Sequence, residues 1–274
     1  MSTAYKSLRI ETVENVAEVV LLGPGKGNAM GPEFWAEFPR AFTDLDRDDA
    51  VRAIVVRGEG DNFSFGLDLK AMLGTLAPHF AGENLARSRT ALLDLVGELQ
   101  QAFDRVERCR KPVIAAIHGW CIGGGVDLIS ACDVRLASQD ARISVREVKV
   151  AMVADLGSLQ RLPRIIGQGH ARELALTGRD IDAERARRIG LVNDVLPTHA
   201  ALLDAARGMA REIAQNPPLV VQGIKQVMSY CEGKSTADGE RYVAVWNAAF
   251  LASKDLMEAL AAFSEKRPAR FTGG

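Results

Sequence analysis

Three acidic side chains follow a run of glycines near the middle of the chain. The glycines occupy residues 123–125, and the acids are Asp127, Glu147 and Asp155. Glycines at a helix entrance let a ligand approach the backbone closely and leave free N–H groups directed at it. Backbone donors of this kind stabilise an oxyanion, and carboxylates behind them can move protons. The stretch therefore predicts enolate chemistry.

Another glycine turn lies earlier in the chain, before the glycines at 123–125. Gly66 is followed by Leu67 and Asp68 at the start of a helical pattern, after an apolar segment at 52–57. Alone, this would be an ordinary strand-to-helix loop with Asp68 as the helix cap. Because the apolar run 112–117 leads in the same way to the glycines at 123–125, the two loops together favour a paired donor site.

Each acid also has a purely structural interpretation. Asp127 could complement a helix dipole, Glu147 could be a surface residue between basic neighbours, and Asp155 could cap a helix that begins at Ser158. A carboxylate in the apolar sequence AMVADLG is costly to bury unless it is paired or protonated. Together with the glycine loops, this favours a functional role for the acids.

The elements that would position these residues alternate between strands and helices up to residue 197. Strands are expected at 6–13, 16–22, 52–57, 112–117, 133–137, 142–144 and 191–196, and helices at 32–47, 87–109, 158–167, 168–177 and 182–189. Residues 74–86 are expected to form a loop near a ligand entrance. Beyond 197 only helices are expected, at 199–214, 217–231, 235–251 and 254–265. The pattern predicts an α/β core with mostly parallel strands over 1–197 and a helical region over 198–274.

The amino-acid composition of the chain limits the classes of function that it could have. The chain has 274 residues, 47% of them hydrophobic, and a net charge of −1, which gives no support for nucleic acid or an anionic membrane as partner. Its cysteines form no C-x-x-C pair and its histidines show no ligand spacing, so no metal site is expected. No apolar run approaches the roughly 18 residues that cross a bilayer, and no targeting segment stands out. We expect a cytoplasmic protein.

The order of the motifs resembles the crotonase superfamily of enoyl-CoA hydratases and isomerases. The segments that carry the resemblance are GKGNAM at 25–30, FSFGLDL at 63–69, HGWCIGGGVDL at 118–128, QRLPRIIG at 160–167 and AFSEKRPARF at 262–271. The resemblance implies a ββα spiral core with a C-terminal helical trimerisation region, and a homotrimer or a dimer of trimers. It also implies an acyl-CoA thioester as substrate, with coenzyme A as part of that substrate and no separate cofactor.

The resemblance further implies roles for particular residues. The thioester oxygen would lie between the backbone N–H groups of Leu67 and Gly124. The residues expected to line the CoA site are Lys26, Asn28, Ala29, Phe65 and Asp68, with Lys266 reaching the phosphates from a neighbouring subunit.

The acids indicate the subgroup. Hydratases of this superfamily usually carry glutamate at both catalytic positions, whereas this chain has Asp127 and then Glu147. Asp155 lies where many hydratases have a glycine, and a third acid there resembles the isomerases that convert a 3,5-dienoyl-CoA to a 2,4-dienoyl-CoA. Glu147 and Asp155 would then be the acid–base pair, and Asp127 would orient or tune them. A Δ2-enoyl-CoA hydratase, an RNA-binding member and a non-catalytic CoA-binding protein remain as alternatives.

Overall fold

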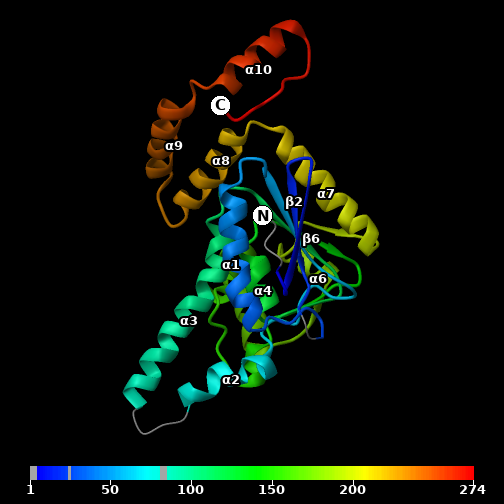
Figure 1. Cartoon of the computed structure of the whole chain (residues 1–274), viewed down its shortest axis with the longest axis vertical. Coiled ribbons are helices and arrows are strands. Elements are labelled where there is room, and N and C mark those ends of the chain that lie inside the picture. Colours follow the sequence, from blue (N-terminus) through cyan, green and yellow to red (C-terminus); the bar gives the residue numbers. More distant parts are fainter. Residues whose placement is uncertain (1–4, 24–25, 81–84) are drawn as a thin grey trace.

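The computed structural model describes residues 5–23, 26–80 and 85–274 (Figure 1). Its strands are β1 Leu8–Val13, β2 Val16–Leu21, β3 Ala53–Gly58, β4 Val113–Ile117, β5 Trp120–Ile122, β6 Val134–Ser138, β7 Arg142–Ser144, β8 Ile181–Asp182 and β9 Asp194–Leu196. Its helices are α1 Pro32–Arg47, α2 Leu69–Phe80, α3 Leu85–Glu107, α4 Gly124–Ser130, the 3₁₀ helix η1 Glu147–Val150, α5 Ser158–Thr177, α6 Ala183–Arg188, α7 His199–Gln215, α8 Pro218–Cys231, α9 Thr236–Phe250 and α10 Lys254–Glu265.

Two sheets organise the α/β core. The larger has the order β1-β2-β3-β4-β6-β9, in which only the hairpin β1–β2 is antiparallel. The smaller has the order β5-β7-β8, and β5 runs parallel to β7. The mostly parallel pairing expected from the alternating pattern is confirmed. The short strand β5, directly before the glycine run, was not expected.

Strand β4 is buried on both faces, as its unbroken apolar sequence predicts. Val113, Ala115 and Ile117 face the large core that includes α1, α3 and α4, while Ile114 and Ala116 face the opposite side. Helix α7 covers that opposite side with Leu202 and with alanines at 206, 210 and 214. A parallel strand with both faces covered holds its carboxyl end rigidly, and the candidate site begins there.

The helical region divides into two parts. Although α7 lies beyond residue 197, it packs on the larger sheet, whereas α9 and α10 extend away from it (Figure 1). The C-terminal segment returns to the core, where the Arg52 guanidinium donates to the carbonyl oxygens of Ala214 at 3.1 Å and Phe271 at 3.0 Å. Within the described ranges, no helix is long and apolar enough to cross a membrane.

The prediction of a loop at 74–86 is wrong over most of that range. Helix α2 continues to Phe80 and α3 begins at Leu85, while residues 81–84 lie outside the described part of the chain. Gly74 and Pro78 disfavour a helix locally, yet Leu69, Met72 and Leu76 recur at helical spacing, and Met72 is buried. Apolar packing therefore outweighs the local preference of the two breakers.

The four cysteines differ in their access to solvent. Cys109, Cys121 and Cys132 are buried, and Cys231 at the end of α8 is partly exposed. Burial raises the pKa of the Cys109 thiol to about 11 and that of Cys132 to about 12. The pKa of Cys121 is also raised well above its ordinary value by burial.

Candidate active site

The two glycine turns come into contact at the carboxyl ends of the central strands. Gly66 has a φ of +74°, and a Cβ built on it would lie 2.6 Å from the backbone nitrogen of Gly124. A Cβ on Gly124 would in turn lie 3.5 Å from the backbone nitrogen of Leu67. Only glycine at these positions allows such an approach. The structure thus brings together the two amides expected from the sequence.

Both amides are free to receive a ligand. The nitrogen of Met30 donates to the Gly66 carbonyl at 2.7 Å, and the nitrogen of Asp68 donates to the Met30 carbonyl at 3.0 Å. Because successive amides of an extended segment alternate in direction, the Leu67 N–H is directed away from Met30. Gly124 is the first residue of α4, where an N–H has no acceptor within the helix. No hydrogen bond among the described residues uses either amide.

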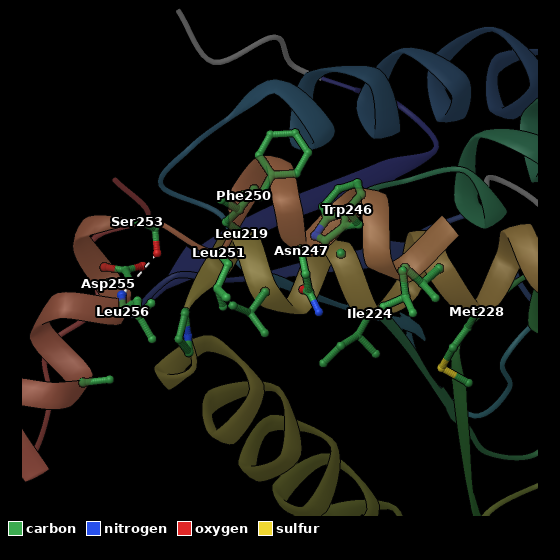
Figure 2. Close-up of a pocket in the computed structure, with 16 residues that line it drawn as sticks. Leu219, Ile224, Met228, Trp246, Asn247, Phe250, Leu251, Ser253, Asp255 and Leu256 are labelled. Atoms are coloured by element: carbon green, nitrogen blue, oxygen red, sulfur yellow. Dashed lines mark hydrogen bonds between the residues drawn. The ribbon is translucent and has the colours of Figure 1, made fainter. Parts of the chain in front are cut away.

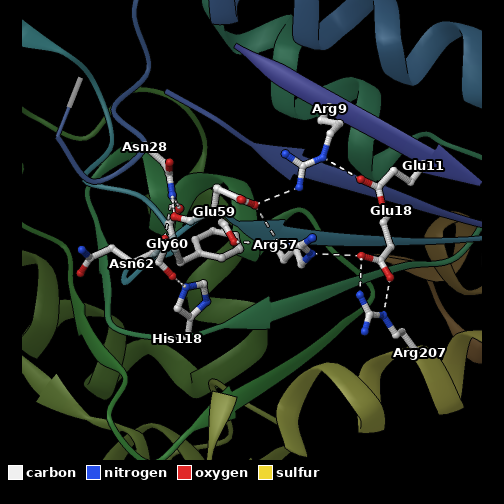
Figure 3. A network of polar contacts seen from close by, with 12 residues as sticks. Arg9, Glu11, Glu18, Asn28, Arg57, Glu59, Gly60, Asn62, His118 and Arg207 are labelled. Atoms are coloured by element: carbon white, nitrogen blue, oxygen red, sulfur yellow. Dashed lines mark hydrogen bonds and ion pairs between the residues drawn. The ribbon is translucent and has the colours of Figure 1, made fainter. Parts of the chain in front are cut away.

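A network of partly buried hydrogen bonds holds the loop that leads to Leu67 (Figure 3). The Asn28 side-chain amide donates to the carbonyl oxygens of Glu59 at 2.8 Å and Asn62 at 2.7 Å. On the other side of this loop, His118 Nε2 lies 2.9 Å from the Gly60 carbonyl oxygen. These contacts tie the loop to residues at the end of β4 and in the 26–30 segment, and the two Met30 hydrogen bonds hold the backbone on either side of Leu67.

Glu147 lies against the second glycine turn. A Cβ on Gly123 would be 3.2 Å from Glu147 Oε1, while the buried Oε2 has no hydrogen-bond partner among the described residues. Burial, together with the negative charge of Asp127, raises the pKa of Glu147 to about 7. The carboxylate also faces an apolar cavity of about 400 Å³ between η1 and α5. Such a group can hold or release a proton near neutral pH.

Asp127 takes the capping role that the sequence suggested as an alternative for Asp155. Its carboxylate Oδ1 accepts a 2.6 Å hydrogen bond from the backbone N–H of Ser158, the first residue of α5. The side chain is almost completely buried, and burial, with a contribution from the charge of Asp155, raises its pKa to about 6. Asp127 thus holds the start of α5, next to the other two acids.

Asp155 completes the group of acids from a loop just before α5. Its side chain reaches solvent, but partial burial raises its pKa. Its negative charge raises the pKa of both Asp127 and Glu147, so the three carboxylates share one electrostatic environment. The arrangement can therefore stabilise an oxyanion on two amides and move protons between nearby carboxyl groups.

Comparisons with known proteins agree with this geometry. The model of the enoyl-CoA hydratase/isomerase family matches residues 11–274. The chain belongs to this family. It is 46% identical to a mitochondrial Δ(3,5)-Δ(2,4)-dienoyl-CoA isomerase of Dictyostelium discoideum, over 97% of this chain and 91% of the relative. It is 42% identical to a peroxisomal enzyme of the same name from Arabidopsis thaliana, over 98% of both chains.

The solved structures show the same fold. The crystal structure of an enoyl-CoA hydratase from Bacillus anthracis matches with a TM-score of 0.88 and 31% identity, over 98% of this chain and 100% of that chain. The chain is thus an enzyme with the crotonase fold, and the names of its relatives support an isomerase. Because these relatives are labelled mitochondrial and peroxisomal, the cytoplasmic location stays a prediction.

The residues expected around CoA in this crotonase-family site occupy different environments. Lys26 is exposed, and Ala29 and Phe65 are partly exposed. Phe65 donates its backbone N–H to the Gly27 carbonyl at 2.8 Å, and its ring lies where a Cβ of Gly27 would be. Lys26, Ala29 and Phe65 thus belong to one accessible loop region, whereas the Asn28 side-chain N–H groups hold the loop at 59–63.

Asp68 and Lys266 do not join this group through their side chains. Asp68 Oδ1 accepts a 2.9 Å hydrogen bond from the Ala71 N–H and so caps α2. Lys266 ends α10 with a φ of +54° and lies on the C-terminal helices that extend from the core (Figure 1). Within one chain, therefore, the structure does not bring Lys266 to the loop at 26–30, and a CoA contact would require a second subunit.

Sequence reasoning missed two residues that contact the loop of Asp155. Gln100 Nε2 donates to the Asp155 carbonyl at 2.6 Å, and Arg161 Nη1 donates to the Leu156 carbonyl at 3.2 Å. The signal for Gln100 was a polar stripe on α3, which was interpreted by its apolar positions alone. Arg161 lies in the family motif QRLPRIIG, but the motif does not say what its side chain binds. In the described part of the chain, no group of three His, Cys, Asp or Glu residues could hold a metal ion.

Proposed function

We propose that this chain is an isomerase that converts a 3,5-dienoyl-CoA to a 2,4-dienoyl-CoA. The observation that carries the proposal is the third carboxylate, Asp155, in one electrostatic environment with Glu147 beside the paired glycine amides. Moving two conjugated double bonds requires a proton to leave C2 and another to arrive at C6, two positions too far apart for one short side chain. The names of the Dictyostelium and Arabidopsis relatives support the same reaction.

In this proposal the thioester oxygen accepts hydrogen bonds from the Leu67 and Gly124 amides. One carboxylate of the pair Glu147 and Asp155 removes the C2 proton, and the electrons spread over the dienolate and onto the thioester oxygen. The other member of the pair, in its protonated form, delivers a proton at C6, which leaves double bonds at C2 and C4. The raised pKa of Glu147 suits either role near neutral pH. CoA is part of the substrate, and Asp127 acts through α5 and the other acids.

The decisive experiment is Asp155→Asn, assayed by ultraviolet absorbance on a 3,5-dienoyl-CoA and, separately, on a 2-enoyl-CoA. Loss of an acid–base group typically costs about 10²- to 10⁴-fold in rate, so isomerisation should fall by that order while the protein stays folded. Glu147→Gln should damage isomerisation and any water addition alike. Asp127→Asn should have the mildest effect on isomerisation, because an asparagine oxygen can still accept from Ser158. If Asp155→Asn leaves isomerisation intact, the proposal is wrong.

The alternative, a Δ2-enoyl-CoA hydratase, predicts a different pattern. A hydratase would use Asp127 and Glu147 on one water and would keep nearly all of its activity in Asp155→Asn. The geometry of the site does not favour this reaction over isomerisation. A hydratase would need Asp127 to hold a water, but its carboxylate already accepts a hydrogen bond from the backbone of α5.

We also propose that the enzyme assembles as a homotrimer or a dimer of trimers. An apolar groove runs between α8, α9 and the start of α10 (Figure 2). Ile224 and Met228 line it with 56% and 69% of their surface exposed, and Trp246 and Phe250 complete its other side. An open apolar surface of this kind is typical of a subunit contact. A second copy would also supply Lys266, which the single chain does not bring to the CoA loop.

A further inference from the structure

Side chains hold much of the backbone of the loop that carries Asp155. Gln100 Nε2 donates to the carbonyl of Asp155 at 2.6 Å, and Arg161 Nη1 donates to the next carbonyl, that of Leu156, at 3.2 Å. The N–H of Ser158 donates to the Asp127 carboxylate at 2.6 Å. Side chains therefore hold the backbone of Asp155 and Leu156 in the loop and of Ser158 at the start of α5.

Two of these contacts depend on a single face of α3. Gln100, Asp104 and Glu107 follow one another at spacings of four and three residues, so they lie in a line along the helix. Asp104 and Glu107 accept hydrogen bonds from Arg161 Nη2 at 2.8 Å and 2.7 Å. The Arg161 side chain is only 7% exposed, and these two carboxylates compensate its buried charge.

Gly157 shows how closely the loop and the guanidinium fit together. Its φ is +117°, and a Cβ built on it would collide with Arg161 Nη1. The arginine thus occupies the space that any larger residue at position 157 would need. Because Asp104 and Glu107 hold Arg161, this contact connects the loop to the same face of α3.

The Asp155 carboxylate, in contrast, depends on its backbone for its direction. No side chain in the described ranges donates a hydrogen bond to it, and it forms no ion pair there. The carbonyl that Gln100 holds is bonded directly to the Cα of Asp155, so this hydrogen bond restrains the backbone at the atom from which the side chain leaves. A proton-transfer group must be placed within a fraction of an ångström of its target.

We propose that Gln100 is a positioning residue that sets the direction of the Asp155 carboxylate for proton transfer. The inference rests on the proposed function, because it takes Asp155 to be one of the two proton-transfer groups. Among the described residues, no hydrogen bond joins Gln100 to the candidate oxyanion amides or to Glu147. Its effect should therefore appear in the turnover of bound substrate rather than in the binding of substrate.

The test replaces the amide of Gln100 with an apolar group of similar length. In Gln100→Met we expect kcat on a 3,5-dienoyl-CoA to fall about tenfold with KM little changed, because the carboxylate is misdirected while the binding loops are untouched. Gln101→Met is the matched control, since Gln101 is exposed on the next position of α3. It should keep the kcat of the unmodified enzyme. A Gln100→Met enzyme with unchanged kcat would overturn the inference.

A double-mutant cycle separates positioning from a general loss of structure. If Gln100 acts only through Asp155, adding Gln100→Met to Asp155→Asn should cause no further loss of kcat. A further tenfold loss in that background would show that Gln100 acts elsewhere and would contradict the proposal.

Amide hydrogen–deuterium exchange tests the clamp without any substrate. Gln100→Met should speed exchange over residues 155–158, and Gln101→Met should not. Unchanged exchange in that loop would overturn the present inference whatever the activity. An unmodified enzyme that fails to isomerise any 3,5-dienoyl-CoA would instead overturn the proposed function, so the two failures are distinguishable.

Discussion

Glu147 combines two properties that oppose each other in a folded protein. Its carboxyl group has one oxygen buried without a donor, yet it must ionise to act as a base. Burial raises its pKa from an ordinary value of 4.5 to about 7, so the folded state binds the proton more tightly than the unfolded state. The stability that this proton contributes is present below the ordinary pKa and is lost as the pH rises through 7.

This linkage gives a measurable pH dependence of folding. Between pH 5 and pH 8 the unfolding free energy of the unmodified protein should fall by on the order of 2 kcal/mol relative to that of Glu147→Gln, whose amide does not titrate. Urea unfolding of both proteins at the two pH values, at one protein concentration, measures the difference. Parallel changes in the two proteins would show that Glu147 has an ordinary pKa.

Among single residues, the sequence identified which residues gather at the site better than it identified the hydrogen bonds they form. The acids and the two glycine turns were found from residue type and order, and the structure brings Leu67 and Gly124 together as expected. Capping of α5 was considered only as an alternative role for Asp155, and Asp127 performs it from 31 residues away. A capping residue that lies on a distant element leaves no local sequence pattern at the helix it caps. Either aspartate could cap α5 by its residue type, so the sequence could not choose between Asp127 and Asp155.

Among the elements, the segment at 63–68 determines whether the two amides can act together. It lies between Met30 and β5, bridged to Met30 through Leu67 and to Cys121 through Ser64. Its position was hidden in the sequence because these pairings are isolated bridges, without the alternating pattern of a full strand. Gly66 is the point at which this segment touches the start of α4.

Gly66→Ala should therefore separate the two amides. The new Cβ would lie 2.6 Å from the Gly124 nitrogen, so the segment must shift away from α4. Loss of one oxyanion donor typically costs about 10²- to 10³-fold in kcat, and we expect a fall of that order. Gly60→Ala is the control, because Gly60 has a similar φ of +70° but no atom near its would-be Cβ. A variant at Gly66 with the kcat of the control would contradict the pairing of the amides.

At the scale of the whole molecule, the C-terminal helices of a single chain leave an apolar groove exposed to solvent. The sequence predicted the helical region, and the structure places several of its apolar residues around an open groove. It also places α7 on the sheet, although α7 lies in the same helical run. Helical periodicity does not distinguish a helix that covers its own sheet from one that leaves an apolar face exposed. Both kinds of helix are amphipathic.

The assembly can be tested by placing a charge in the groove. Ile224→Asp would bury a carboxylate in the subunit contact, so light scattering should show a monomer where the unmodified protein gives a trimer or hexamer. Val13→Asp is the control, because Val13 is 69% exposed at the far end of the β1–β2 hairpin. It should keep the mass of the unmodified protein. A monomeric unmodified protein at micromolar concentration would exclude the proposed assembly.

The uneven burial of the cysteines makes the chain suitable for labelling without engineering. Cys109, Cys121 and Cys132 are enclosed in the core and have raised pKa values, so they stay protonated and unreactive. A maleimide dye added to the native protein should therefore attach to Cys231, at the end of α8. Since α8 forms one wall of the apolar groove, the fluorescence of a dye on Cys231 would report the proposed association of subunits over time.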